Sequence, residues 1–142
     1  MTHRLAQITA EIPLASRAAP NALLDRPPNV LAADCPSRQV LKHLTSQWGT
    51  LVLLALQPGT LRFSALRRVV GGVSERMLAQ TLQVLEADGL ILRYAHQVVP
   101  PHVDYSLSPM GVEAALRIAE LTGWIEASLP DILAHRAKQT QA

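Results

Sequence analysis

The chain has 142 residues, a formal net charge of +2 and 49% hydrophobic residues, enough for one domain with a packed core. Its single cysteine, Cys35, excludes an internal disulfide and a cysteine-rich zinc site, which fits a reducing compartment. The longest apolar run, Leu51 to Leu56, is too short to span a bilayer, so no membrane association and a cytoplasmic location are expected.

Positive charge is concentrated in one segment of the chain. From Cys35 to Arg76 there are six basic residues and one acidic residue, so this segment carries +5 and the rest of the chain −3. A local basic excess on a nearly neutral protein favours an anionic partner, with nucleic acid first. A solvated charged face is the alternative interpretation.

Residues 1–34 differ in composition from the rest of the chain. They contain four of the ten prolines (Pro13, Pro20, Pro27 and Pro28), and their charges cancel. This composition predicts a flexible or loosely docked N-terminal extension, followed by one organised domain over residues 35–142.

The first half of that domain is predicted to be helical with one short extended segment. A helix begins at Pro36 after a cap at Asp34 or Cys35, and "WGTLVLLALQPG" forms a buried helix that stops at Pro58. "TLRF" can pair with a later strand, and "SALRRVVGG" is a short helix that ends at its two glycines.

The stretch "VSERMLAQTLQVLEADGLI" predicts an amphipathic helix capped by Ser74 and ended by Gly89. Leu78, Leu82 and Leu85 form its apolar stripe. Its first turns expose Ser74, Arg76, Gln80 and Gln83. These polar side chains either contact a partner or are simply hydrated by solvent.

A hairpin and a long helix complete the predicted domain. "LILRYAHQVV" and "HVDYSL" form two strands with an irregular tip, which places His96 opposite His102. A helix begins at Ser108-Pro109 and runs to about Leu129, and Pro130 restarts a short final helix. The long helix is apolar over more than one face, and this surplus of apolar surface predicts a dimer.

This order of elements is typical of a mainly α winged helix-turn-helix with a small β-hairpin. The second helix of the motif enters the major groove, where Arg pairs with guanine and Gln with adenine, and the hairpin lies against the backbone. The predicted DNA-binding residues lie on the recognition helix (Ser74, Arg76, Gln80, Gln83), on the preceding helix (Arg67, Arg68) and around the hairpin (Arg62, Arg93, His96, His102).

From Cys35 onward the chain resembles the HxlR-type winged-helix transcriptional regulators of bacteria. The resemblance rests on collinear motifs: "CPSRQVLKHL", "SQWGTLVLLAL", "LRFSALRRVVGGVSERMLAQTLQVLEADGLILR", "VVPPHVDYSLSPMG" and "ELTGWIEA". It implies a homodimer that binds a pseudo-palindromic operator, with dimer contacts from the first and last helices. The residues expected in these contacts are Val40, Leu44, Ile118, Leu121, Trp124 and Ile125.

The chain departs from the family pattern at Gln47, where a basic residue is usual, and on the recognition helix, where Ala79, Thr81 and Gln83 replace frequent basic residues. This reduced charge keeps a second function open, a winged-helix protein-interaction module without DNA binding.

Cys35 corresponds to a cysteine that redox-sensing members of the family use. A thiol at a helix N-terminus has a lowered pKa, and Arg38 is nearby, but a structural cap without a sensing role is the alternative. A small-molecule or oxidant effector therefore stays a hypothesis, and a sensor requires a partly exposed thiol.

Neither an enzyme nor a metal or cofactor site is expected, although a metal-dependent sensor stays open as a third function. The sequence shows no catalytic constellation, and His96 and His102 lack an evident carboxylate or thiol partner.

Overall fold

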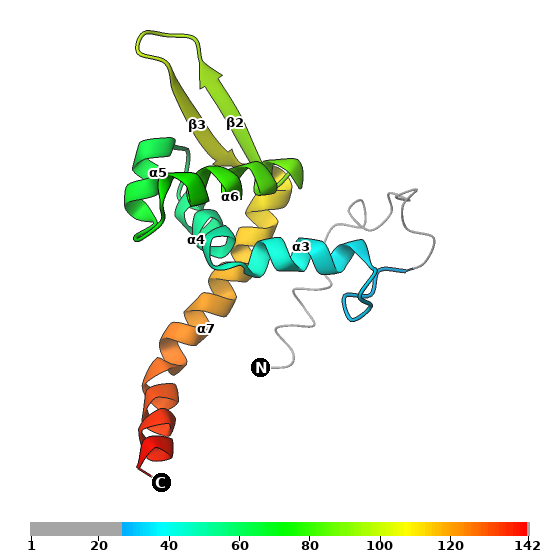
Figure 1. Cartoon of the computed structure of the whole chain (residues 1–142), viewed down its shortest axis with the longest axis vertical. Helices are drawn as coiled ribbons and strands as arrows, with labels where there is room; N and C mark the ends of the chain where they lie inside the picture. Colours follow the sequence, from blue (N-terminus) through cyan, green and yellow to red (C-terminus); the bar gives the residue numbers. More distant parts are fainter. Residues whose placement is uncertain (1–26, 142) are drawn as a thin grey trace. The chain divides into compact units, whose positions relative to one another are not determined.

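The computed structural model describes residues 27–141 (Figure 1). Its contacts divide the chain into two units, Met1–Arg38 and Gln39–Ala142. Most of the predicted extension over residues 1–34 lies outside the described residues. In the first unit the backbone turns twice, with Ala32 N donating to Asn29 O and Cys35 N donating to Ala32 O. Helix α3, Pro36–Thr45, begins directly after these turns, as its proline predicts.

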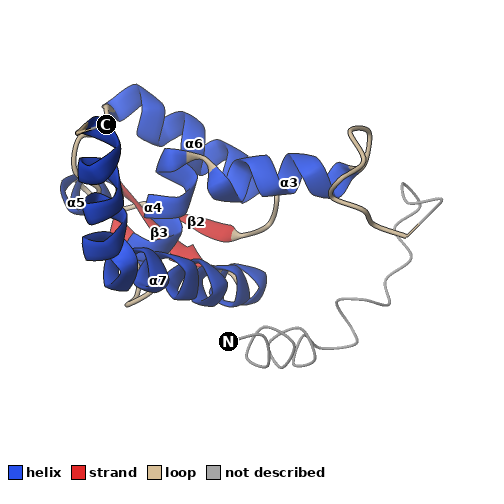
Figure 2. Cartoon of the chain, turned by 90° about the horizontal axis from the view of Figure 1, so that it is seen from below, coloured by secondary structure: helices blue, strands red, loops and turns tan. Residues whose placement is uncertain are grey.

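The second unit has a core built largely from three helices. These are α4 (Gln47–Leu56), α5 (Phe63–Val69) and α6 (Glu75–Ala87). Helix α4 contacts α5, α6 and α7, and Figure 2 shows it between α6 and α7. The largest fully buried side chains come from these helices and the first strand residue after them: Val52, Leu53, Leu56, Leu66, Leu78, Leu82, Leu85 and Ile91. Helix α6, the expected recognition helix, is therefore held against the core by its leucine stripe, as predicted.

Three strands form an antiparallel sheet in the order β1-β3-β2. They are β1 (Leu61–Arg62), β2 (Ile91–His96) and β3 (His102–Leu107). The short segment after α4 does pair with a later strand, because Leu61 lies opposite Tyr105. Strands β2 and β3 form the hairpin, which we call the wing, and His96 lies opposite His102 in it. The mainly α winged helix-turn-helix fold is thus confirmed.

The last helix, α7, is continuous from Pro109 to Thr140, so the prediction of a separate final helix after Pro130 is wrong. A proline inside a helix removes one N–H donor and leaves the carbonyl four residues earlier without its partner. Here that carbonyl belongs to Glu126, which is exposed, so water can supply the missing hydrogen bond. Figure 1 shows the C-terminal half of α7, in orange to red, extending away from α4, α5 and α6. None of the helices over residues 27–141 is long and apolar enough to cross a membrane.

The start of α7 is fastened directly to the backbone between α6 and β2. Ser108 caps the helix by accepting a hydrogen bond from Gly111 N, and its hydroxyl donates to the carbonyl of Gly89 over 2.6 Å. A Cβ atom at Gly111 would overlap the carbonyl oxygen of Leu90. Only glycine therefore allows α7 to pack this closely against the chain that leads into the wing.

Candidate nucleic-acid interface

The helix-turn-helix consists of α5, the turn 70–74 and α6. Gly72 lies in this turn with a φ of +86°, a region that glycine adopts without steric cost. Ser74 follows as the N-cap of α6, with its hydroxyl oxygen accepting a hydrogen bond from Met77 N at 3.1 Å. Ser74 therefore has a structural role, and its exposed hydroxyl can still donate its own hydrogen to a phosphate.

The outer face of α6 carries the predicted base-reading side chains. Arg76, Gln80 and Gln83 are exposed. They have the same i, i+4, i+7 spacing as the buried leucines of this helix and are offset from them by two residues, which is about 200° around the helix axis. The structure therefore brings these three side chains together on the face that points away from the core.

Exposed arginines lie in and directly before α5, the first helix of the motif. Arg67 and Arg68 are in the last turn of α5, and Arg62 is the residue before its first turn. Arg67 and Arg68 also line a surface depression between α5 and the start of α6, together with Phe63, Ser64, Val73 and Glu75. Because guanidinium groups bind phosphate oxygens in a bidentate manner, this surface suits contacts with a nucleic-acid backbone.

The wing carries its predicted residues on two opposite faces. Arg93 lies opposite Tyr105, which is buried, whereas His96 lies opposite His102. Successive strand residues point to opposite faces, so Arg93 shares a face with Tyr105 and the two histidines lie on the other face. When a nucleic acid binds one face of the wing, the side chains of the other face therefore point away from it.

His96 does have a carboxylate partner, and His102 lies within 4.8 Å of the same carboxylate, so the sequence-based statement that the two histidines lack one is wrong. Asp104 Oδ2 lies 2.6 Å from His96 Nε2, and the rings of His96 and His102 are stacked with centroids 4.3 Å apart. Asp104 follows His102 by two residues in β3 and therefore shares its face. The alternation of side chains that predicted β3 also places Asp104 on the same face as His102, so this carboxylate could have been identified from the sequence.

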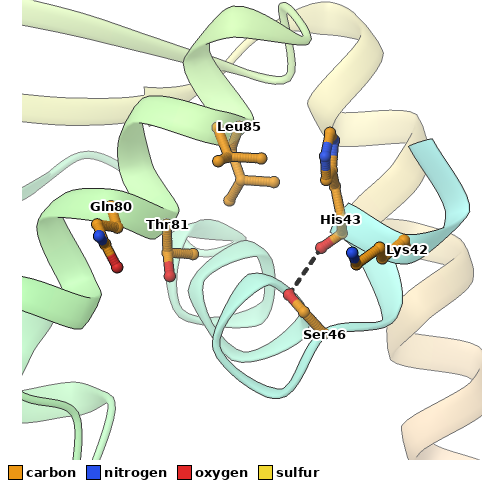
Figure 3. A pocket seen from close by; sticks show the side chains of 7 residues that line it. Lys42, His43, Ser46, Gln80, Thr81 and Leu85 are labelled. Atoms are coloured by element: carbon orange, nitrogen blue, oxygen red, sulfur yellow. Dashed lines mark hydrogen bonds between the residues drawn. The ribbon is translucent and has the colours of Figure 1, made fainter. Parts of the chain in front are cut away.

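A hollow of about 200 Å³ lies on the side of α6 that faces α3 (Figure 3). Gln80 and Thr81 line it from α6, and Lys42, His43 and Ser46 line it from α3 and the start of α4. Ligand pockets for small molecules usually measure about 300–1,000 Å³, so this hollow is small for an effector. Gln80 borders both the hollow and the outer face of the recognition helix.

The six residues expected in a dimer contact fall into two groups. Leu44 and Ile118 are half-buried and pack against the core, so part of their apolar surface is already used within the unit. Val40, Leu121, Trp124 and Ile125 are exposed, with Leu121 at 53% and Trp124 at 52%. The second group leaves apolar side chains exposed on α3 and on α7.

Cys35 is buried, with 3% of its surface exposed. Its Sγ accepts a hydrogen bond from Asn29 N at 3.3 Å and lies 3.0 Å from Ser37 Oγ. The partly exposed thiol that a sensor requires is therefore not present in this conformation. These contacts agree with a structural role at the start of α3.

Comparison with known proteins agrees with this geometry. The family model described as "HxlR-like helix-turn-helix" matches residues 43–132. The HTH-type transcriptional regulator YtfH of Escherichia coli (strain K12) is 59% identical over 108 residues, which are 76% of this chain and 86% of that protein.

Solved structures are also similar to this chain. The putative transcriptional regulator ytfH from Salmonella typhimurium has 57% identity and a TM-score of 0.75, covering 78% of this chain and 98% of that one. The redox regulator HypR in its oxidized form has 31% identity and a TM-score of 0.60, covering 66% of this chain and 96% of that one. With the family match spanning more than half of its residues, the chain belongs to the HxlR-like helix-turn-helix family of transcriptional regulators.

Proposed function

We propose that the protein is a homodimer that binds a pseudo-palindromic DNA operator in a sequence-specific manner. The observation that carries this proposal is the outer face of α6, where Arg76, Gln80 and Gln83 are exposed opposite a buried leucine stripe. Arg76 can form two hydrogen bonds to guanine, and each glutamine can form two to adenine.

Phosphate contacts would fix the position of α6 in the groove. Arg67 and Arg68 at the end of α5 and Arg62 before it supply three cations, and the first two line a surface depression together with Glu75 at the start of α6. Each phosphate that a cation neutralises releases a counterion, so the logarithm of the binding constant falls with the logarithm of the salt concentration. The proposed interface therefore has a measurable electrostatic signature.

The dimer places two copies of α6 on one side of a DNA duplex. Successive major grooves on one face are roughly 34 Å apart, so the two helices need a fixed separation. The exposed apolar residues of α7 and Val40 of α3 supply a surface that a second copy can cover. A self-complementary contact of this kind produces the two-fold symmetry that a pseudo-palindromic operator matches.

The experiment combines selection and titration. Selection from random DNA followed by nuclease protection on the neighbouring promoters identifies the operator, and titrations at several salt concentrations measure its affinity. We expect a steep salt dependence, with the slope reduced by about 1 when Arg67 or Arg68 is replaced by Ala. Binding that is absent, or independent of salt, would contradict the proposal.

A second function is a winged-helix module that acts through protein contacts alone. It is favoured by the low charge of α6, whose charged residues are Glu75, Arg76 and Glu86. In that case the titrations would show only weak binding, equal for selected and scrambled DNA. A protein partner would then have to be sought on the same face of α6.

The proposal also includes a response to oxidants through Cys35. Its support is the similarity to HypR, which is described as a redox regulator, and the position of the thiol at the start of α3. Since the thiol is buried, an oxidant can reach it only when the segment from Asn29 to Cys35 opens locally. The chain has one cysteine, so oxidation would give a disulfide with a second copy or with a small-molecule thiol.

A further inference from the structure

We propose that the wing binds a divalent transition-metal ion, represented by Zn²⁺, through His96, His102 and Asp104. One potential ligand atom from each of these residues lies within 4.8 Å of the other two. Two imidazoles and one carboxylate form a ligand set that suits Zn²⁺, and a site with three protein ligands leaves a further position for water or another oxygen.

The hairpin register creates this cluster. His96 and His102 are a directly opposed pair on β2 and β3, and Asp104 lies two residues further along β3 on the same face. The three ligands therefore come from the hydrogen-bonded ladder, with His96 and His102 as its last pair before the irregular tip. Only the side chains have to adjust when an ion enters.

The adjustment required is small. Zn–N and Zn–O bonds of about 2.0–2.2 Å place the ligand atoms of a tetrahedral site about 3.3 Å apart. His96 Nε2 and Asp104 Oδ2 are already within 2.6 Å, so this pair must separate slightly to admit the ion. The widest separation in the cluster must shorten by at most roughly 1.5 Å, which rotation about side-chain bonds can provide.

An unpartnered nitrogen supports a ligand at this position. His102 Nδ1 is shielded from solvent and has no hydrogen-bond partner among the residues that the structure describes. A shielded polar atom without a partner costs free energy, and an ion or water bound to this nitrogen would remove the cost. The competing interpretation is that the His96–Asp104 hydrogen bond and the stacked histidine rings only hold the wing together.

A second histidine–aspartate pair in the protein provides a matched control. His43 Nδ1 and Asp88 Oδ2 also lie 2.6 Å apart, at a similar exposure, but no third ligand in residues 27–141 joins them. If any such pair captured zinc, the two pairs would behave alike. If the third ligand matters, only the wing will bind zinc tightly.

The test is a titration of Zn²⁺ into the untagged full-length chain in competition with a chromophoric chelator, without DNA. We expect one tight ion per chain, weakened by more than about tenfold in Asp104→Asn and in His102→Ala, because outer-sphere changes alone cost about 10–100-fold. The His43→Asn control should bind zinc like the original chain. Because Asp104→Asn preserves the size of the side chain, it tests the site even if His102→Ala disturbs the wing.

Two results would overturn the proposal: equal zinc affinity in Asp104→Asn and the original chain, or an equal loss in His43→Asn. Since no DNA is present, neither result bears on the DNA-binding function proposed above.

Discussion

His43 Nδ1 and Asp88 Oδ2 lie 2.6 Å apart and join α3 to the C-terminal end of the recognition helix. Both side chains are about one-fifth exposed. This side-chain hydrogen bond links α3, which is expected at the dimer interface, to α6, which is expected in the major groove.

We expect a double-mutant cycle of His43→Asn and Asp88→Asn to give a coupling free energy of about 0.5–1.5 kcal/mol. Urea unfolding of the four proteins measures this value. Additive effects of the two substitutions would show that the pair does not stabilise the native state.

The base-reading role of α6 can be tested at Arg76. Arg76→Ala should weaken binding to the selected operator by about 1–3 kcal/mol and affect scrambled DNA much less, since a bidentate base contact is sequence-specific. Lys138→Ala, which removes an equal charge from the far end of α7, is the control. Equal losses on both DNAs would make Arg76 a phosphate contact, and no loss on either would remove it from the interface.

The proposed dimer surface can be tested at Leu121. This residue is 53% exposed, so Leu121→Asp should leave the core intact and shift sedimentation of the protein from dimer to monomer. Ile118 is a poorer site for this test, because it packs against the core and a charge there would also unfold the unit. A stable monomer of the original chain at micromolar concentration would contradict the proposal.

Two glycines of α7 should respond to alanine in opposite directions. At Gly111 the added methyl group would overlap the carbonyl of Leu90. Gly111→Ala should therefore destabilise the protein by about 1–3 kcal/mol or more. At Gly123 nothing lies within 4 Å, and Gly123→Ala should stabilise the helix by about 0.5–1 kcal/mol. Denaturant unfolding measures both values, and destabilisation by Gly123→Ala would show that this position is covered.

The redox hypothesis can be tested by the Cys35→Ser substitution. Treatment with mild peroxide or a quinone should reduce operator binding by the original chain and leave Cys35→Ser unaffected. Because the thiol is buried, its modification should be slow and should accelerate with low concentrations of denaturant. If both proteins respond alike, or neither does, Cys35 is a structural residue and any signal acts elsewhere.

Local signals in the sequence were sufficient for most of the fold. Ser74 and Ser108 cap the helices that they were predicted to cap, and the alternation around Tyr105 produced a strand. Pro130 was misread because a proline usually ends a helix, whereas an exposed helix can leave one carbonyl to water.

The candidate sites were less predictable because they depend on pairing between distant residues. Asp104 joins His96 only when the register of the hairpin is known, and His43 meets Asp88 only after α3 and α6 have packed. The exposure of Arg76, Gln80 and Gln83 on α6 follows from helical spacing alone, and it was predicted.

The close approach of Gly111 to Leu90 has a consequence for signalling. At Gly111 no side chain separates α7 from the carbonyl of Leu90, and Ser108 fastens the same junction through its hydrogen bond to Gly89. There is no deformable layer in which a displacement of α7 could be absorbed. A molecule that displaces the exposed half of α7 is therefore expected to move the junction between α6 and the wing as well.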